Sequence, residues 1–421
     1  MSNERQRIAV IGAGVSGLTT AWLLSEKYDV ELFEAGDYAG GHTNTEIVTA
    51  GGREWPVNTG FIVFNDWTYP NFMKLMDRLG VASEVSDMSF SVDCHSSGLQ
   101  YNGTSLNTLF AQRSNLLNLP FLRMIQEILR FNKESRADLA AGNIADTETL
   151  GEYLNRNGYS RYFRQYYIVP MGAAIWSAPE IVLEQFPIRF FLQFFNNHGM
   201  LSVDDRPTWR VISGGSARYV DAMMERLGDR THLNSPVSSV VREPDHVVVT
   251  VNHEHHHFDQ VVFACHSDQA LGMIADPSAK ELEILGAITY QRNDVVLHTD
   301  RSVLPSNRRA WAAWNYFIPQ HSTEPVSVTY NMNILQNFDE APETFCVTLN
   351  RSQDIDPERV IKCFDYAHPV FTLEAVAAQK RYDEIGGQNR SHFCGAYWFN
   401  GFHEDGVSSA LRVTRALGVE L

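Results

Sequence analysis

The chain has 421 residues, of which 44% are hydrophobic and 20% are charged, and its formal net charge is −16. This composition is typical of an ordinary globular protein with enough chain for two or three domains. The acidic balance argues against nucleic acid as a partner and against a generally basic membrane-binding surface.

The cysteines and the apolar runs bear on where the protein is found. The five cysteines are far apart, and no pair has metal-ligand spacing, so we expect reduced thiols. No apolar run reaches the roughly 20 residues that span a bilayer. The first apolar stretch is typical of a buried strand rather than of a signal peptide. We therefore expect a cytoplasmic protein, with peripheral attachment to the inner membrane left open.

A glycine-rich loop near the start of the chain is the strongest motif. It lies among three predicted elements, namely a strand at residues 7–11, a helix at 18–27 and a second strand at 30–34. In such a dinucleotide-binding loop, Gly12 permits the tight turn and Gly14 lets the backbone approach a pyrophosphate. Gly17 lets the helix pack closely on the strand, and the helix N-terminus attracts phosphate. Glu34, at the end of the second strand, can accept both ribose hydroxyls.

A second glycine pair, Gly40–Gly41, follows and continues as His42-Thr43-Asn44-Thr45. This pattern resembles the flavoproteins of the amine-oxidase and phytoene-desaturase superfamily, in which the loop crosses the pyrophosphate and approaches the flavin. The resemblance implies an FAD cofactor. It also implies an α/β fold with a Rossmann-like FAD-binding domain and an inserted α+β substrate domain. We expect noncovalent FAD, because no cysteine lies where the covalent cysteine of monoamine oxidases would be expected.

The end of the chain also resembles these flavoproteins. Residues 393–396 predict a last short strand, and residues 404–407 lead into a terminal helix whose apolar residues have helical spacing. In the superfamily, the N-terminus of this helix points at the flavin N1–C2=O edge, where a helix dipole stabilises negative charge. The predicted cofactor-binding residues are Gly12, Gly14, Ser16, Gly17, Glu34, Gly40, Gly41, His42, Thr43, Thr59, Gly60, Val237, Gly395, Gly406 and Val407; in the superfamily, the position of Val237 makes a backbone contact to adenine.

The nucleotide-binding pattern recurs in pieces, which predicts a discontinuous FAD-binding domain at residues 5–85, 208–290 and 385–421. Two insertions, residues 86–207 and 291–384, would form the substrate-binding domain. Further predicted elements are helices at 69–79 and 119–139, and strands at 238–242, 246–251, 260–265, around 294–298 and around 311–316.

Residues 186–195 contain five phenylalanines. The pattern favours a buried core helix, and the alternative is the wall of a long apolar substrate tunnel.

Residues 253–257 contain four histidines. We interpret them as a polar hairpin tip between two strands rather than a metal site, because adjacent side chains on a strand point to opposite faces. No metal site is predicted.

Seven further blocks resemble a subgroup of FAD-dependent amine-oxidase-like proteins. This subgroup includes the N-terminal flavoprotein half of plant cyclopropane fatty acid synthases and bacterial flavoproteins encoded near cyclopropane-synthase-like methyltransferases. The resemblance implies an apolar or lipid substrate and such a methyltransferase as a partner. The blocks are residues 58–65, 68–71, 86–92, 168–177, 297–300, 310–316 and 395–398.

The chain departs from true amine oxidases at two positions. Those enzymes have Arg where this chain has His42, and they commonly place a Lys on a substrate-domain strand, whereas residues 292–297 contain none. An amine oxidase also needs aromatic residues that cage a neutral amine. Residues of that kind are Trp176, Trp314, Tyr316, Tyr397 and Trp398, which could equally pack the cofactor.

We therefore expect a flavin-dependent oxidoreductase that desaturates or dehydrogenates an acyl chain of a fatty acid or membrane phospholipid. Such a protein positions the chain and excludes water, while the flavin supplies the redox chemistry. The candidate acid–base residues are His403, Asp294 and Tyr397. Three alternatives stay open: an amine oxidase, a polyisoprenoid desaturase or isomerase, and a non-catalytic flavoprotein that supports a lipid methyltransferase.

Overall fold

The first strand of the chain lies at the centre of a parallel sheet in the computed structural model, which describes residues 5–177, 179–320 and 327–421. The order of this sheet is β10 (Thr231–His232), β2 (Asp29–Phe33), β1 (Arg7–Ile11), β14 (Gln260–Phe263) and β20 (Ser391–Phe393). All four pairings are parallel. Both faces of a parallel sheet are normally covered, which explains why the apolar residues of β1 are buried without alternation.

Alternate side chains of β1 enter two different cores. Ile8 and Val10 pack with α1 (Val15–Leu24), α2 (Pro70–Leu79), α10 (Ala217–Leu227) and α15 (His403–Ala416). Ala9 and Ile11 face the other core. That core contains residues from β11 (Val237–Arg242), β12 (Val247–Val251), β13 (Glu254–Phe258), α11 (Ser267–Met273), α12 (Ala279–Gly286) and α14 (Leu373–Gln379).

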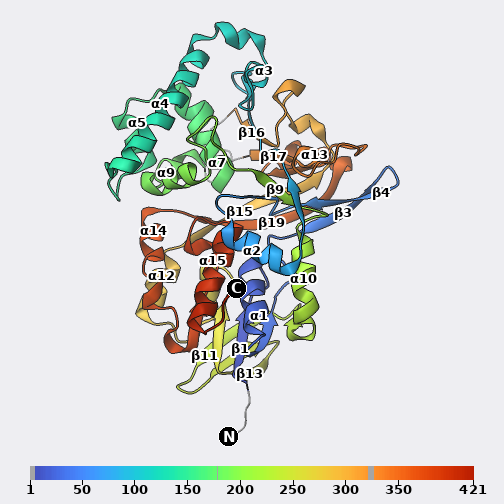
Figure 1. The fold of residues 1–421 in the computed structure, drawn as a ribbon, viewed down its shortest axis with the longest axis vertical. Helices are drawn as coiled ribbons and strands as arrows, with labels where there is room; N and C mark the ends of the chain where they lie inside the picture. Colours follow the sequence, from blue (N-terminus) through green and yellow to red (C-terminus); the bar gives the residue numbers. More distant parts are fainter. Residues whose placement is uncertain (1–4, 178, 321–326) are drawn as a thin grey trace.

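A second, seven-stranded sheet forms the base of the other half of the molecule (Figure 1). Its order is β19 (Val360–Val370), β15 (Thr289–His298), β18 (Cys346–Leu349), β17 (Ser327–Asn331), β16 (Trp314–Ile318), β7 (Phe90–Cys94) and β8 (Gln100–Asn102). Neighbours are antiparallel except for β16 and β7, so the sheet is mixed. The long strands β15 and β19 pair along their length and lie between the two halves.

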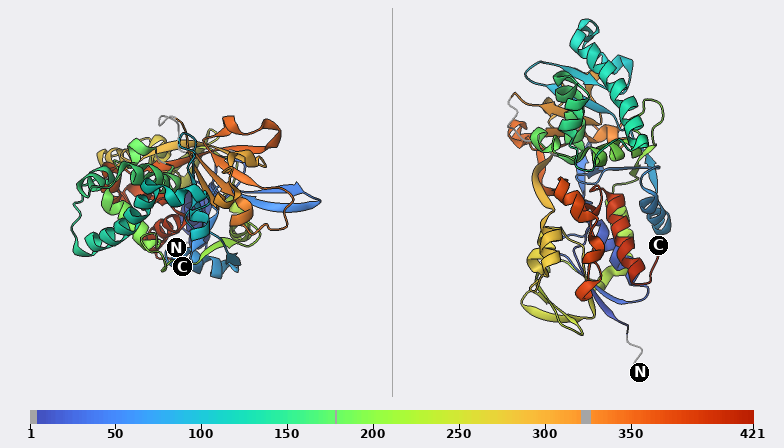
Figure 2. Two further views of the ribbon diagram at one scale, coloured as in Figure 1. Left: turned by 90° about the horizontal axis from the view of Figure 1, so that it is seen from above. Right: turned by 90° about the vertical axis from the view of Figure 1, so that its left-hand side faces the viewer.

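Helices cover this sheet at the end of the molecule opposite the N-terminus (Figures 1 and 2). They are α3 (Leu106–Leu109), α4 (Leu119–Ala141), α5 (Leu150–Arg156), α6 (Arg161–Phe163), α7 (Val169–Trp176), α8 (Glu180–Leu183) and α9 (Ile188–Asn197). Local signals fix their ends. For α4, the Asn118 side chain accepts a hydrogen bond from Phe121 N, and Gly142 ends the helix in the left-handed conformation at φ +69°.

Three smaller groups complete the fold. They are the hairpin of β3 (Thr45–Ala50) and β4 (Arg53–Asn58), the sheet of β5 (Val63–Asn65), β9 (Trp209–Ile212) and β6 (Ser83–Val85), and the short helix α13 (Met332–Leu335).

Two local predictions from the sequence are wrong. The last strand ends at Phe393, and residues 394–395 instead lead into a 3-10 segment at Ala396–Trp398. The histidine-rich stretch is not a hairpin tip, because Glu254–Phe258 forms β13 and pairs with β12. The turn consists of Asn252 and His253, both at positive φ. The proposed domain boundaries stay predictions.

Candidate functional site

The loop between β1 and α1, together with the first turn of α1, contains three glycines, and two of them have no room for a side chain. Gly12 has φ +102°, and a Cβ there would lie 3.0 Å from the carbonyl oxygen of Ala264 on the neighbouring strand. A Cβ on Gly17 would overlap the carbonyl oxygen of Gly12. A Cβ on Gly14, in contrast, would meet no atom within 4 Å. Gly12 and Gly17 are therefore required by packing, whereas Gly14 borders open space beside the N-terminus of α1.

The second glycine pair lies directly on this loop. Gly40 N donates to Ala13 O at 2.8 Å, and a Cβ on Gly41 would be 3.2 Å from the Cα of Gly14. The chain continues to His42, whose carbonyl accepts from Phe61 N at 2.8 Å, while Thr59 N donates to Asn44 O at 3.0 Å. A Cβ on Gly60 would overlap the His42 carbonyl oxygen. The predicted residues 40–43 and 59–60 thus form one layer against the first loop.

Glu34 lies at the end of β2, where it binds the first loop. Its Oε2 accepts from Ala13 N at 2.7 Å and its Oε1 from Gly36 N at 2.8 Å. Each carboxylate oxygen retains a second acceptor site for a ribose hydroxyl. Ser235 N donates to Glu34 O at 2.8 Å, which places the segment leading into β11, and hence Val237, next to this edge.

The N-termini of α1 and α15 are in contact. Ser16 Oγ donates to Gly406 O at 3.0 Å, and a Cβ on Gly406 would lie 2.6 Å from Val15 Cγ1. Val407 is fully buried, and Gly395 N donates to Ser409 Oγ at 2.7 Å. Two helix N-termini therefore present their positive ends to one region, as an anionic cofactor requires.

His403, the first residue of α15, belongs to a buried polar cluster. Its Nε2 is 2.8 Å from Thr43 Oγ1 and 3.2 Å from the Tyr219 hydroxyl, which also hydrogen-bonds Thr43 Oγ1. The ring stacks on Phe61 with centroids 3.5 Å apart. Burial lowers the pKa of His403 to about 3, so the imidazole is neutral at physiological pH. Tyr219 could not be found from the sequence, because it lies far from both partners along the chain.

The other two acid–base candidates lie elsewhere. Asp294 is exposed on β15, on the opposite face from the fully buried Asn293. Tyr397 is buried, its hydroxyl has no partner within the described residues, and burial raises its pKa well above the usual value. No contact joins the three candidates among the described residues, and their catalytic roles stay predictions.

Three histidines from separate segments gather beside the second glycine pair. The ring of His42 stacks on His368 of β19 with centroids 5.5 Å apart and lies 6.3 Å from His266. Burial lowers the pKa of all three, for His368 to about 4. His42 Nε2 is buried and has no partner in the described part of the chain. An unpartnered buried nitrogen is unfavourable, so this atom is suited to contact a ligand.

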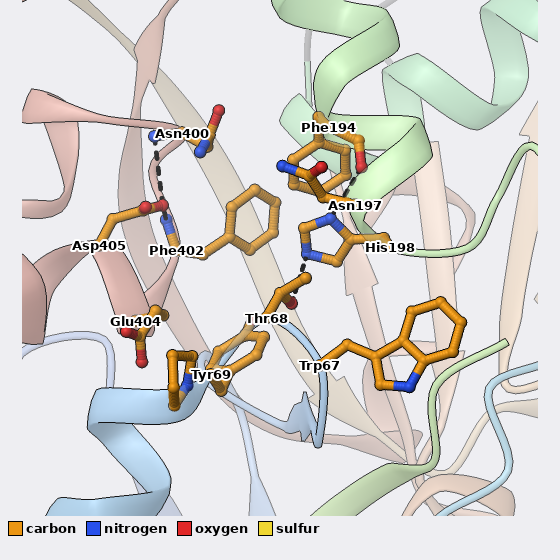
Figure 3. Close-up of a pocket in the computed structure, with 11 residues that line it drawn as sticks. Trp67, Thr68, Tyr69, Phe194, Asn197, His198, Asn400, Phe402, Glu404 and Asp405 are labelled. Carbon is orange, nitrogen blue, oxygen red and sulfur yellow. Dashed lines mark hydrogen bonds between the residues drawn. The ribbon is translucent and has the colours of Figure 1, made fainter. Parts of the chain in front are cut away.

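A cavity of about 380 Å³ lies between α2, α9 and the start of α15 (Figure 3). Phe194 and Phe402 both line it, and their rings stack on each other with centroids 4.9 Å apart. Asp405 accepts from Phe402 N at 2.8 Å and from Asn400 N at 3.2 Å, and burial raises its pKa to about 7. The cavity is lined by Trp67, Thr68, Tyr69, Pro70, Phe194, Asn197, His198, Asn400, Phe402, Glu404 and Asp405.

The phenylalanine run supplies both the core and this cavity. Phe186, Phe191 and Phe195 are buried in the core of the helical region, which confirms the core prediction for them. Phe194, on the same helix, lines the cavity. Helical periodicity predicts a buried face, but it does not say which ring borders an opening.

Comparison with known proteins identifies the family. The model of the flavin-containing amine oxidoreductase family matches residues 15–343. The chain belongs to this family. The fold class predicted from the sequence, α/β with a Rossmann-like FAD-binding domain and an inserted α+β substrate domain, is confirmed, and the sheet of the substrate domain is mixed.

The similarity to individual family members is distant. The chain is 25% identical to the flavin-containing amine oxidase A of Canis lupus familiaris over 270 residues, which are 61% of this chain and 49% of that protein. It therefore spans about half the length of the curated relatives it matches. The cyclohexylamine oxidase of Brevibacterium oxydans has a TM-score of 0.69 at 14% identity, over 98% of this chain and 99% of the other. A fatty acid isomerase from P. acnes that produces CLA has a TM-score of 0.63 at 16% identity, over 97% and 98%.

FAD is the cofactor that this family implies, and the described residues fit it. The open space at Gly14, the unpartnered His42 Nε2 and the start of α15 follow the carboxyl ends of the parallel strands β1, β2 and β20, respectively. Glu34 would hold the ribose, the Gly14 and Gly41 backbone the pyrophosphate, and the start of α15 the flavin end. The individual contacts, and noncovalent attachment, stay predictions.

In residues 5–177, 179–320 and 327–421, no three His, Cys, Asp or Glu side chains are grouped as metal ligands. Nor does any helix in these ranges have the length and apolar character needed to cross a membrane.

Proposed function

We propose that this protein is an FAD-dependent oxidoreductase that dehydrogenates an acyl chain of a fatty acid or phospholipid. FAD, when bound, supplies the hydride acceptor. The residues around it would hold the acyl carbon in reach, exclude water and accept a proton.

The observation that carries the acyl-chain proposal is that the buried side of β15 and β19, around Asn293 and His368, carries no charge. Fully buried Asn293 lies on β15, where the sequence offers no lysine, and its Nδ2 is 3.3 Å from His368 Nδ1. Its Oδ1 accepts from Asn350 Nδ2 at 2.9 Å. Because these groups are neutral at pH 7, they suit an uncharged part of a substrate. An acyl C–H bond needs only positioning in a dry site.

The histidines beside this buried side supply a proton acceptor. At neutral pH the buried imidazoles of His42 and His368 are unprotonated, because burial lowers both pKa values. His368 Nδ1 already accepts from Asn293 Nδ2, so His42, whose Nε2 has no partner within the described residues, is the proposed acceptor of the proton lost from a neighbouring carbon. The fold of the P. acnes fatty acid isomerase supports the view that this architecture accommodates an acyl chain. A cyclopropane-synthase-like methyltransferase is the proposed partner, on the sequence resemblance alone.

Amine oxidation is the second candidate, and the cavity at α15 favours it. Glu404 and Asp405 contact only neutral groups within the described chain, and the rings of Trp67, Tyr69 and Phe402 line the same space. Carboxylates and aromatic faces together stabilise an ammonium group. The curated relatives are themselves amine oxidases.

Anaerobic bleaching of the flavin absorption band tests the two candidates. The panel would contain phospholipids with unsaturated, methyl-branched or cyclopropane acyl chains, primary and secondary amines, and carotenoid precursors. Bleaching by one lipid class alone would support acyl-chain oxidation, and bleaching by amines alone would replace it with the second candidate. Bleaching by carotenoid precursors would indicate a polyisoprenoid substrate, and bleaching by none would favour a non-catalytic partner of a methyltransferase.

A further inference from the structure

Helix α3 and the start of α4 lie at the end of the molecule opposite the N-terminus (Figure 1), and this stretch of chain carries four exposed leucines. They belong to α3, to the 3-10 segment Arg113–Leu117 and to the start of α4, and we refer to residues 106–119 as the tip segment. The exposed fractions are 77% for Leu106, 51% for Leu116, 88% for Leu117 and 75% for Leu119. Scattered exposed leucines are ordinary, but several from one short segment indicate an interaction surface.

The charge around the tip segment is opposite to that of the whole chain. No Asp or Glu occurs between Asp93 and Glu127, although the chain carries a net charge of −16. The Arg113 guanidinium donates only to neutral oxygens of Asn107 and Phe110. Arg123 differs, because it lies 3.7 Å from Glu127.

A neighbouring turn adds two more arginines. The 3-10 segment Arg308–Ala310 packs against α3 and β8, and Asn307 Nδ2 donates to Ala111 O at 2.9 Å. Arg308 and Arg309 are exposed. Within the described ranges, neither they nor Arg113 forms an ion pair with a carboxylate. The leucines are thus accompanied by positive charge that has no acidic partner.

We propose that the tip segment docks the protein on a lipid bilayer that carries anionic headgroups. Leucines that enter the acyl boundary and arginines at the headgroup level are the combination that holds a monotopic protein at a membrane. Leucine is under-represented among the residues that dominate protein–protein contacts, which favours a lipid surface over a protein partner for these four side chains. The proposal does not depend on the oxidised substrate, because its readout is binding alone.

Sedimentation with vesicles tests this proposal on the full-length protein. We expect binding to vesicles that contain phosphatidylglycerol and weak binding to pure phosphatidylcholine. The double variant Leu116→Ser/Leu117→Ser should bind at least about tenfold more weakly, because two leucines no longer enter the acyl region. The matched control is Ile47→Ser/Val85→Ser, which removes two aliphatic side chains with 59% and 58% exposure from other elements and should bind like the wild type.

A second pair of variants tests the charge. Arg113→Gln/Arg309→Gln should lower binding to anionic vesicles roughly 30-fold, because each of the two arginines near a charged surface contributes about 1 kcal/mol. Arg218→Gln, an exposed site on α10, should leave binding unchanged. Circular dichroism and the unfolding midpoint would verify that all variants fold.

Three results would overturn the proposal. The first is a wild-type protein that stays in the supernatant with anionic vesicles. The second is equal binding by the leucine variant and its control. The third is a dimer in solution that the leucine variant abolishes, which would make a second copy of the chain the occupant of this surface.

Discussion

The loop between β1 and α1 and the interior around α9 show two different ways of building a site. In the first, the absence of side chains sets the geometry, since a Cβ on Gly17 would overlap the Gly12 carbonyl oxygen. In the second, large rings fill the space, as where Phe191 and Phe195 stack with centroids 4.2 Å apart. The glycine loop tolerates almost no variation, so its sequence is recognisable, whereas an aromatic interior can be filled by many sequences.

The largest expected effect is that of Gly17→Val. The added side chain would displace either α1 or the backbone of β1, so we expect a loss of more than about 5 kcal/mol and no folded flavoprotein. Soluble yield and chemical denaturation would measure it. The control is Gly272→Ala in α11, where a Cβ meets no atom within 4 Å. A folded, flavin-containing Gly17→Val protein would contradict the packing argument.

Gly14→Val separates cofactor binding from folding. Its side chain points into open space, so we expect an unfolding free energy within about 1 kcal/mol of that of the wild-type apoprotein. The purified protein should nevertheless be colourless, because valine would occupy the space of the pyrophosphate. Flavin absorbance per chain measures this, and full flavin content would show that FAD does not lie over Gly14.

Phe191→Ala should have the opposite effect, namely a loss of stability without a loss of flavin. Phe191 is fully buried in the helical region, and its truncation should lower the unfolding free energy by about 3–5 kcal/mol. The glycine loop lies in the other domain, so each folded molecule should keep its flavin. Loss of flavin from Phe191→Ala protein that is still folded would contradict this separation of the two regions.

Asp405→Asn should change the pH dependence of stability. Burial raises the folded-state pKa of Asp405 to about 7, above its unfolded value. This contribution to stability is therefore complete at low pH, falls as the pH rises and is lost above about pH 7. Relative to Asp405→Asn, the wild type should lose up to about 1 kcal/mol per pH unit between about pH 4 and 7, less than the unscreened value because Asp405 is partly exposed. Unfolding midpoints across this range measure the effect, and the exposed Asp77→Asn serves as control.

Parts of the site that are continuous in sequence could be predicted, and parts assembled from distant segments could not. Gly12, Gly14, Gly17 and Glu34 lie within one strand–helix–strand unit, so spacing alone indicated their arrangement. Tyr219 reaches Thr43 and His403 only through the packing of α10. Asn293 and His368 meet because β15 pairs with β19 in a particular register, which the hydrophobic pattern does not specify.

The acid–base candidates also show that the sequence does not specify which side chains face the site. The sequence predicts a strand around residues 294–298, and β15 covers these residues, yet the side-chain alternation places Asp294 on the exposed face and Asn293 on the buried one. A shift of one residue along a strand reverses this assignment, and strand ends are the least certain part of a sequence-based prediction. His42 was predicted only as a cofactor contact, and its burial with two other histidines became visible only in three dimensions.

Acyl-chain oxidation is tested most directly by the mass of the lipid product. The holoenzyme would be mixed anaerobically with a phospholipid that bleaches the flavin, and the acyl chains would be analysed by mass spectrometry. If the protein oxidises acyl chains, we expect one acyl chain that has lost two hydrogen atoms for each flavin reduced. Flavin reduction by amines with unchanged acyl chains would contradict it.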